Sequence, residues 1–144
     1  MINLKEIKKA VSDVLQSEFP DTPVYGVDTV EGYKRPSFFV TISLDILEAT
    51  RNCVHKTAEI EIDYIQPAPD EEKALEFFTK TEQRFVPKLE VADRKLTTSE
   101  FYFDFLGDHG DIPHVEFQTE FWDDWGMEET AELMKEFNMK QEVK

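Results

Sequence analysis

The sequence predicts an α+β protein with a largely antiparallel or mixed β-sheet and two helices packed on one face. The prediction rests on two amphipathic helical patterns, each followed by a pair of stretches in which apolar and polar residues alternate. In chain order these segments are residues 4–19, 37–47 with 58–64, 70–85, and 101–105 with 115–121. The order helix, strand pair, helix, strand pair favours an α+β domain over parallel βαβ winding.

The first helix is bounded by sequence signals at both ends. Asn3 and Glu6 have the spacing of a capping box, and apolar residues recur at helical spacing over residues 4–19. Pro20 cannot continue a helix, so the chain is expected to turn there. A short extended piece around residues 24–27 follows.

The next two stretches are expected to pair as an antiparallel hairpin, because both alternate at period two. The apolar side of the first stretch consists of Phe38, Val40, Ile42, Leu44 and Ile46. In the second stretch the apolar side consists of Ala58, Ile60, Ile62 and Tyr64, and the acidic side of Glu59, Glu61 and Asp63.

The second helix and the last strands follow the same logic. Asp70, Glu71 and Glu72 place negative charge on the first turn of the helix, and Pro87 stops it. A short strand around residues 89–91 comes next, and the last two alternating stretches are joined by a turn with hairpin chemistry. We expect one domain over residues 1–125 and a weakly helical C-terminal tail over residues 126–144.

Composition limits the function classes. The 144 residues include 16 Lys and Arg against 31 Asp and Glu, which gives a formal net charge of −15. Such a chain cannot neutralise phosphates as a broadly basic nucleic-acid binder does. A single cysteine excludes an internal disulfide framework, and neither a secretory signal nor an apolar run of membrane-spanning length is present. We expect a cytoplasmic protein that does not enter membranes and whose partners are proteins.

No motif predicts catalysis. The chain has no glycine-rich phosphate loop, nucleophile elbow or Cys-x-x-Cys pair. Cys53 and His55 share a strand face without an identifiable orienting acid. A set of possible ligands near one hairpin matches no known metal spacing: Asp104, Asp108, His109, Asp111 and His114. We therefore expect no enzyme activity, no metal and no cofactor.

The acidic row Glu59, Glu61 and Asp63 has two interpretations. A row of like charges on one face of a strand is usually a solvated sheet face. It is also what a sheet bordering a DNA conduit requires, because carboxylates repel phosphates and keep DNA from sticking.

Several segments, in order, resemble a known family. They are Leu4–Val11 running into Glu18-Phe19-Pro20 and Val24-Tyr25, then Arg35–Val40, Ile60–Ile65 and Val115–Phe121. In this order, the hydrophobic patterns resemble those of the tail terminator family of tailed phages. The resemblance is greatest to members from phages and defective prophages of Gram-positive bacteria. The resemblance covers roughly residues 1–125.

The resemblance implies a structural assembly protein of the virion, made in the host cytoplasm. It would form a hexameric ring at the head-proximal end of the tail tube, stop tube growth and join the tail to head completion or connector proteins. DNA would pass through the ring without specific binding. Candidate carboxylates of the lumen are Glu59, Glu61, Asp63, Asp108 and Asp111, and candidate partner contacts in the tail are Met127, Leu133, Met134 and Phe137.

The charge also fits a second class of protein. A monomeric acidic inhibitor, immunity protein or DNA mimic would use a net charge of −15 to complement a basic partner. The two hypotheses differ in assembly, because an inhibitor has no reason to form a ring or to associate with tail tubes.

Overall fold

The computed structural model describes residues 2–26 and 31–124. Helix α1 spans Leu4–Glu18 and helix α2 spans Glu71–Phe85. The strands within these residues are β1 (Val24–Tyr25), β2 (Ser37–Ala49), β3 (Cys53–Ile65), β4 (Lys88–Val91), β5 (Arg94–Leu106) and β6 (Ile112–Asp124). The predicted α+β fold is confirmed, and each segment predicted before the tail corresponds to one of these elements, whereas the predicted tail over residues 126–144 lies outside the described residues.

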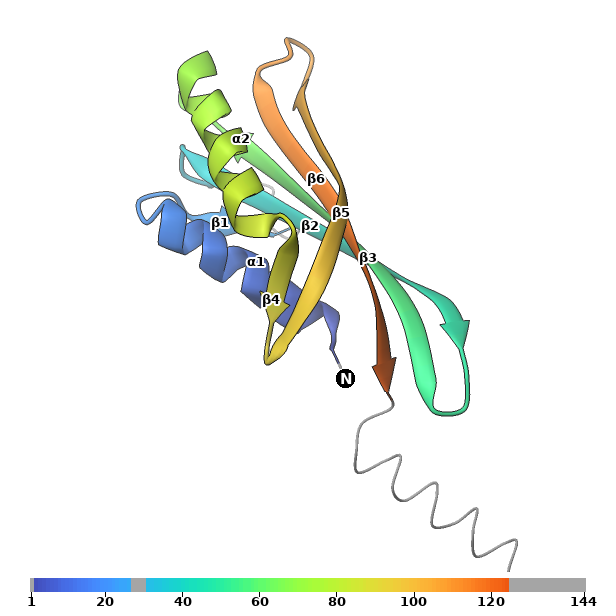
Figure 1. Ribbon diagram of the computed structural model, residues 1–144. Coiled ribbons are helices and arrows are strands. Elements are labelled where there is room, and N and C mark those ends of the chain that lie inside the picture. Colours follow the sequence, from blue (N-terminus) through green and yellow to red (C-terminus); the bar gives the residue numbers. More distant parts are fainter. Residues whose placement is uncertain (1, 27–30, 125–144) are drawn as a thin grey trace, which may run out of the picture.

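The strands form one curled, mixed sheet in the order β1-β2-β3-β6-β5-β4 (Figure 1). Strand β1 runs parallel to β2, and the other neighbouring strands pair antiparallel. The predicted hairpin of β2 and β3 is present, with Val40 opposite Ile62. The two hairpins, β2–β3 and β5–β6, join through the pairing of β3 with β6, where Ile60 lies opposite Phe117.

Both helices begin at the residues that the sequence indicates. The side chain of Asn3 accepts a hydrogen bond from the Glu6 amide at 2.9 Å, and that of Asp70 accepts one from the Lys73 amide at 3.1 Å. Helix α2 ends at Phe85, two residues before Pro87, which has no amide hydrogen to continue the ladder.

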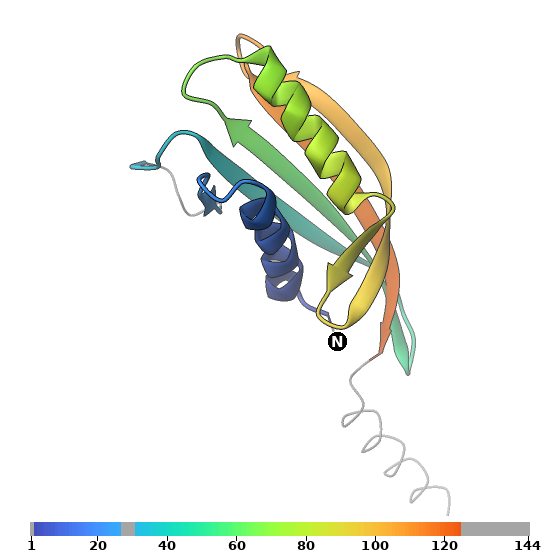
Figure 2. The ribbon, with the colours of Figure 1, turned by 60° about the vertical axis from the view of Figure 1, so that its left-hand side comes forward.

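The two helices cover the same face of the sheet (Figures 1 and 2). Aromatic rings fill the space between the layers: Phe38 of β2 stacks on Phe77 of α2 with centroids 5.3 Å apart, and Phe117 of β6 stacks on Phe85 at 5.0 Å. All four side chains are almost completely buried. The core therefore lies between the helices and one face of the sheet, and the other face is left to solvent or to partners.

The β2–β3 hairpin extends past the helices toward its turn (Figure 1). Along the helix-facing side of β2, Val40 is buried, Ile42 and Leu44 are half-buried, and Ile46 is 62% exposed. The period-two pattern thus gives the side of the strand correctly, but the length of the helix layer decides how much of that side is covered.

A buried polar cluster fixes the N-terminal segment to the end of β6. The Asp123 carboxylate, 5% exposed, accepts hydrogen bonds from the Ile2 amide at 2.6 Å and from Lys56 Nζ at 3.2 Å. Lys56 also donates to the Ile2 carbonyl at 3.2 Å, and Arg94 reaches the second Asp123 oxygen at 3.2 Å. Opposite charges therefore satisfy one another where the start of α1 meets β3 and β6.

The predicted tail contacts, Met127, Leu133, Met134 and Phe137, lie outside the described residues. Across residues 2–26 and 31–124, neither helix has the length and apolar character needed to cross a bilayer.

Candidate functional site: an acidic face of the sheet

The face of the sheet opposite the helices is acidic. Glu59, Glu61 and Asp63 lie together on this face of β3, as their alternation with buried residues predicts. On the neighbouring strand β6, Gln118 lies opposite Glu59 and Glu116 opposite Glu61. Two adjacent strands therefore present polar and mainly acidic side chains side by side.

The acidic character extends to the strands on either side. This face also carries Asp45 and Glu48 on β2, Glu100 and Asp104 on β5, and Glu120 on β6. In the described residues of β2, β3 and β6, and of β5 from Ser99 onward, no Lys or Arg side chain is on this face. Lys56, near the start of the same strand β3, points to the other side and binds Asp123.

A compact cluster of four titratable side chains lies where the end of β3 pairs with the start of β6. Asp63 lies directly opposite His114, and its carboxylate is 2.6 Å from His114 Nδ1. His114 Nε2 is 3.5 Å from a carboxylate oxygen of Glu116. Glu61 completes the group, with ligand atoms of Glu61, His114 and Glu116 all within 4.8 Å of one another. His114 is 6% exposed, so its ring is buried among the polar side chains of this cluster.

The pKa values of Glu61 and His114 depend on burial and on the nearby carboxyl groups. Burial, followed by a hydrogen bond to Glu116, raises the pKa of Glu61, because two adjacent carboxyl groups are more stable when they share a proton. Burial of the His114 ring acts to lower its pKa, but hydrogen bonds and charges from Asp63 and Glu116 outweigh burial and raise this pKa above 6.5. Folding therefore favours the protonated forms of Glu61 and His114.

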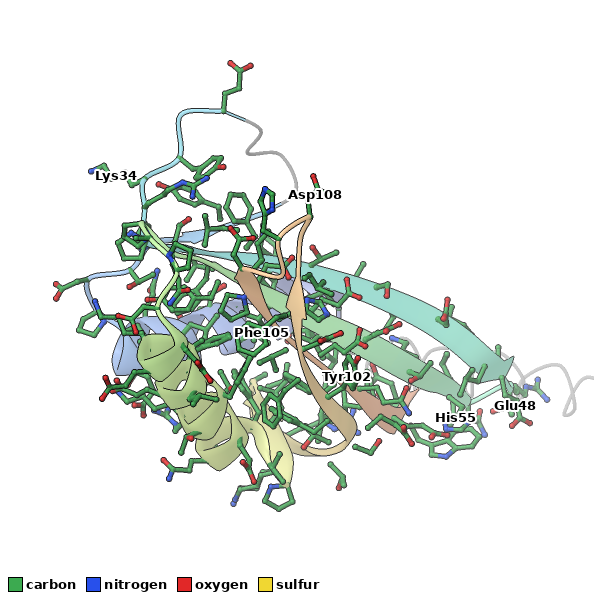
Figure 3. All side chains as sticks on the ribbon, turned by 90° about the horizontal axis from the view of Figure 1, so that it is seen from above. Lys34, Glu48, His55, Tyr102, Phe105 and Asp108 are labelled. Atoms are coloured by element: carbon green, nitrogen blue, oxygen red, sulfur yellow. The ribbon has the colours of Figure 1, made fainter. Side chains whose placement is uncertain are left out.

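The outer part of the face, on β5, has a second pair. Tyr102 donates a hydrogen bond to Asp104 at 2.9 Å, and this contact raises the pKa of the Tyr102 phenol. A hydrogen bond from the Phe105 amide, followed by the bond from Tyr102, lowers the pKa of Asp104. Figure 3 shows Tyr102 over this strand, between the His55 end of the sheet and the turn that carries Asp108. Asp104 thus stays ionised and adds to the negative charge.

Asp108 and Asp111, the other two candidate lumen residues, lie apart from the carboxylate row. Both are exposed in the turn that joins β5 to β6, at one end of the sheet (Figure 3). Asp111 and His109 line a depression between this turn and the start of α2, together with Asp70 and Phe105. The turn therefore forms a separate surface from the row on β3.

The possible metal ligands near this hairpin are not gathered into one site. His114 turns to Asp63 and Glu116, and Asp104 bonds to Tyr102. In residues 2–26 and 31–124, the group of potential ligands close enough to share an ion is instead Glu61, His114 and Glu116.

Cys53 and His55 lie at the far end of the sheet. Contrary to the sequence analysis, His55 does have an acidic partner: its Nε2 is 2.7 Å from Glu120. The His55 ring also stacks on Trp122 with centroids 4.4 Å apart. The contacts with Glu120 and Trp122 explain the position of the His55 imidazole on the surface of the sheet.

Sequence reasoning missed the β6 half of the site. Glu116, Gln118 and Glu120 alternate with buried residues as regularly as the β3 row does, so their shared face could have been predicted. That β6 lies next to β3 could not, because the two strands are far apart in sequence and pair across the sheet centre.

One known protein family matches most of this chain. A family model described as phage tail terminator protein matches residues 6–131. A solved structure whose title is only an identifier is 10% identical, covers 88% of this chain and 98% of its own, and has a TM-score of 0.48. No curated protein matches the chain. The family match defines a structural protein of phage tails. The chain belongs to the phage tail terminator family.

Proposed function

We propose that this protein caps the head-proximal end of the phage tail tube as a hexameric ring. In that position it stops tube growth and joins the tail to head completion or connector proteins. Family membership, over residues 6–131, supports a role in tail assembly. The same proposal places the protein in the host cytoplasm during assembly and in the virion afterwards.

We further propose that the acidic sheet face lines the channel of the ring. The observation that carries this proposal is a face over β2, β3, β6 and the second half of β5 that is rich in carboxylates and carries no described Lys or Arg. Salt screens charges beyond about 8 Å at physiological ionic strength, so only carboxylates close to the DNA backbone affect its passage. Glu59, Glu61 and Asp63 are the candidates in the row, and Asp108 and Asp111 are candidates at one rim.

The C-terminal tail is proposed to contact a neighbouring subunit or the tube. Met127, Leu133, Met134 and Phe137 supply flexible and apolar side chains that can fit an irregular groove. Truncation after residue 126 tests this proposal, because it removes those side chains and keeps the described strands. Rings and tube binding that are unchanged by truncation would overturn it.

The ring is tested by electron microscopy and native mass spectrometry of the protein, alone and with tubes assembled from the tube protein of the same phage. A ring of six subunits at one end of each tube is expected. A monomer that ignores tubes would overturn the proposal, and binding to basic partners would then be tested, as the acidic-inhibitor hypothesis requires.

The channel is tested by charge reversal with a matched control. The face variant carries Glu59→Lys and Glu61→Lys, and the control carries Glu72→Lys and Glu82→Lys at exposed positions near the two ends of α2. Both variants change the net charge equally, and in the control the effects on the helix dipole oppose one another. We expect rings of the face variant to retain DNA in a salt-dependent way and rings of the control to release it.

Two results would contradict the channel assignment. One is equal DNA retention by both variants, which would show that net charge alone matters. The other is loss of ring formation in the face variant alone, which would show that the acidic face contacts other subunits.

A further inference from the structure

The cluster of Glu61, His114 and Glu116 on the acidic face has the geometry of a metal site. Glu61 and Glu116 lie directly opposite each other on β3 and β6, and His114 is two residues from Glu116 on the same side of β6. One ring nitrogen of His114 and one oxygen from each glutamate lie within 4.8 Å of one another. Ligands at the usual 2.0–2.2 Å around a tetrahedral Zn²⁺ are about 3.4 Å apart, so small side-chain rotations would close the group on one ion.

His114 is already oriented as a metal-bound histidine is. Its Nδ1 is held by Asp63 at 2.6 Å, which leaves Nε2 directed to Glu116 at 3.5 Å. Metal-ligating histidines commonly donate their second ring nitrogen to a carboxylate, which fixes the tautomer and makes the ligand more basic. The imidazole is 6% exposed, so its orientation is fixed by packing as well as by Asp63.

The charge balance of the cluster also favours a cation. Three carboxylates, Glu61, Asp63 and Glu116, surround one imidazole, and no Lys or Arg of β2, β3, β6 or of β5 from Ser99 onward lies on this face to balance them. A divalent ion bound here would offset much of this negative charge.

We propose that Glu61, His114 and Glu116 bind one divalent transition-metal ion of the Zn²⁺ class, with Asp63 orienting His114 and water at the remaining position. The imidazole ligand favours Zn²⁺, Co²⁺ or Ni²⁺ over Mg²⁺ and Ca²⁺, which prefer oxygen ligands. The site lies within one chain and does not depend on the ring or on the channel.

The test measures metal binding directly. Purified full-length protein, stripped with a chelator, is titrated with Zn²⁺ by calorimetry and with Co²⁺ by visible absorption, whose ligand-field bands report the number and type of ligands. We expect one Co²⁺ per chain, displaced by Zn²⁺ and not by an excess of Mg²⁺. Glu61→Gln, Glu116→Gln and His114→Asn should each abolish the stoichiometric binding, with circular dichroism used to verify the fold.

Two further variants separate this site from general metal binding by an acidic protein. Asp63→Asn keeps the three ligands but weakens the support of His114, so it should lower the affinity about 10–100-fold. His55→Asn is the matched control for His114→Asn, because His55 lies on the same face of the sheet, on β3, and also contacts a glutamate of β6, at 2.7 Å. It should leave binding unchanged.

Either of two results would overturn the proposal. The first is the absence of saturable binding of one ion per chain in the micromolar range. The second is binding that survives His114→Asn or Glu61→Gln in a folded variant, or that is lost in His55→Asn. Neither result would bear on ring formation, which is measured without metal.

Discussion

Replacing Asp123 with alanine should be one of the most destabilising single changes in the described part of this chain. Its carboxylate accepts hydrogen bonds from the Ile2 amide, from Lys56 Nζ and from Arg94, at 2.6, 3.2 and 3.2 Å. The Lys56 side chain is 6% exposed, so after the change its ammonium keeps the Ile2 carbonyl as its remaining contact and cannot reach water freely. Removing one partner of a buried ion pair costs about 3–5 kcal/mol.

The Arg94 side chain contributes less to this cost. It is 37% exposed and can turn to water, so its lost bond falls in the range of exposed pairs, about 0–1 kcal/mol. We therefore expect Asp123→Ala to lower the free energy of unfolding by about 3–5 kcal/mol. Since domains of this size have about 5–15 kcal/mol in total, the variant should be close to the limit of folding.

The assay is equilibrium urea unfolding followed by far-ultraviolet circular dichroism. Glu90→Ala is the control, because it breaks the exposed Lys88–Glu90 pair at 3.8 Å and should change stability by less than about 1 kcal/mol. A loss below about 1 kcal/mol for Asp123→Ala, or one equal to that of the control, would refute the argument that burial makes this cluster critical.

Three further predictions concern the core, one turn and one phenol. Phe117→Ala should lower the free energy of unfolding by about 3–5 kcal/mol, measured by urea unfolding, because this ring is 1% exposed and stacks on two others. Gly107→Ala should cost about 1–3 kcal/mol, more than Gly110→Ala, in the same assay. Both glycines have positive φ, but a Cβ at Gly107 would also lie 3.1 Å from the side chains of Asp111 and Ile112. Burial, followed by the charge of Asp70, raises the pKa of Tyr64 above 10.0. The protonated phenol is thus favoured in the fold, and its stabilisation is complete below pH 10.0 and lost as pH rises through the raised pKa. An ultraviolet tyrosinate titration should show two late phenols, Tyr64 and Tyr102, and one of them should be absent in Tyr64→Phe. Equal late parts of the two curves would contradict this assignment.

The elements of the fold could be predicted because their signals are local. Asn3 caps α1, Asp70 caps α2, and period-two alternation marks β3 and β6 within a few residues of chain. Even the side of β3 that carries Glu59, Glu61 and Asp63 follows from alternation, because a strand sends successive side chains to opposite faces.

The candidate site could be predicted only by half, because it is built across strands. Glu61 and Glu116 are brought together by the pairing of β3 with β6, and so are Asp63 and His114. Nothing local in either strand specifies that register.

By itself, then, the sequence determined the α+β class, the helix boundaries, the negative charge and the resemblance to tail terminators, which the family match over residues 6–131 confirms. Only the tertiary structure decided that both described helices cover the same face of the sheet, and that His114 lies opposite Asp63 on the other face. The physical reason is the distance along the chain over which each kind of interaction acts. Capping and alternation act over a few residues, whereas the sheet order follows from how two hairpins bury their apolar sides against the same pair of helices.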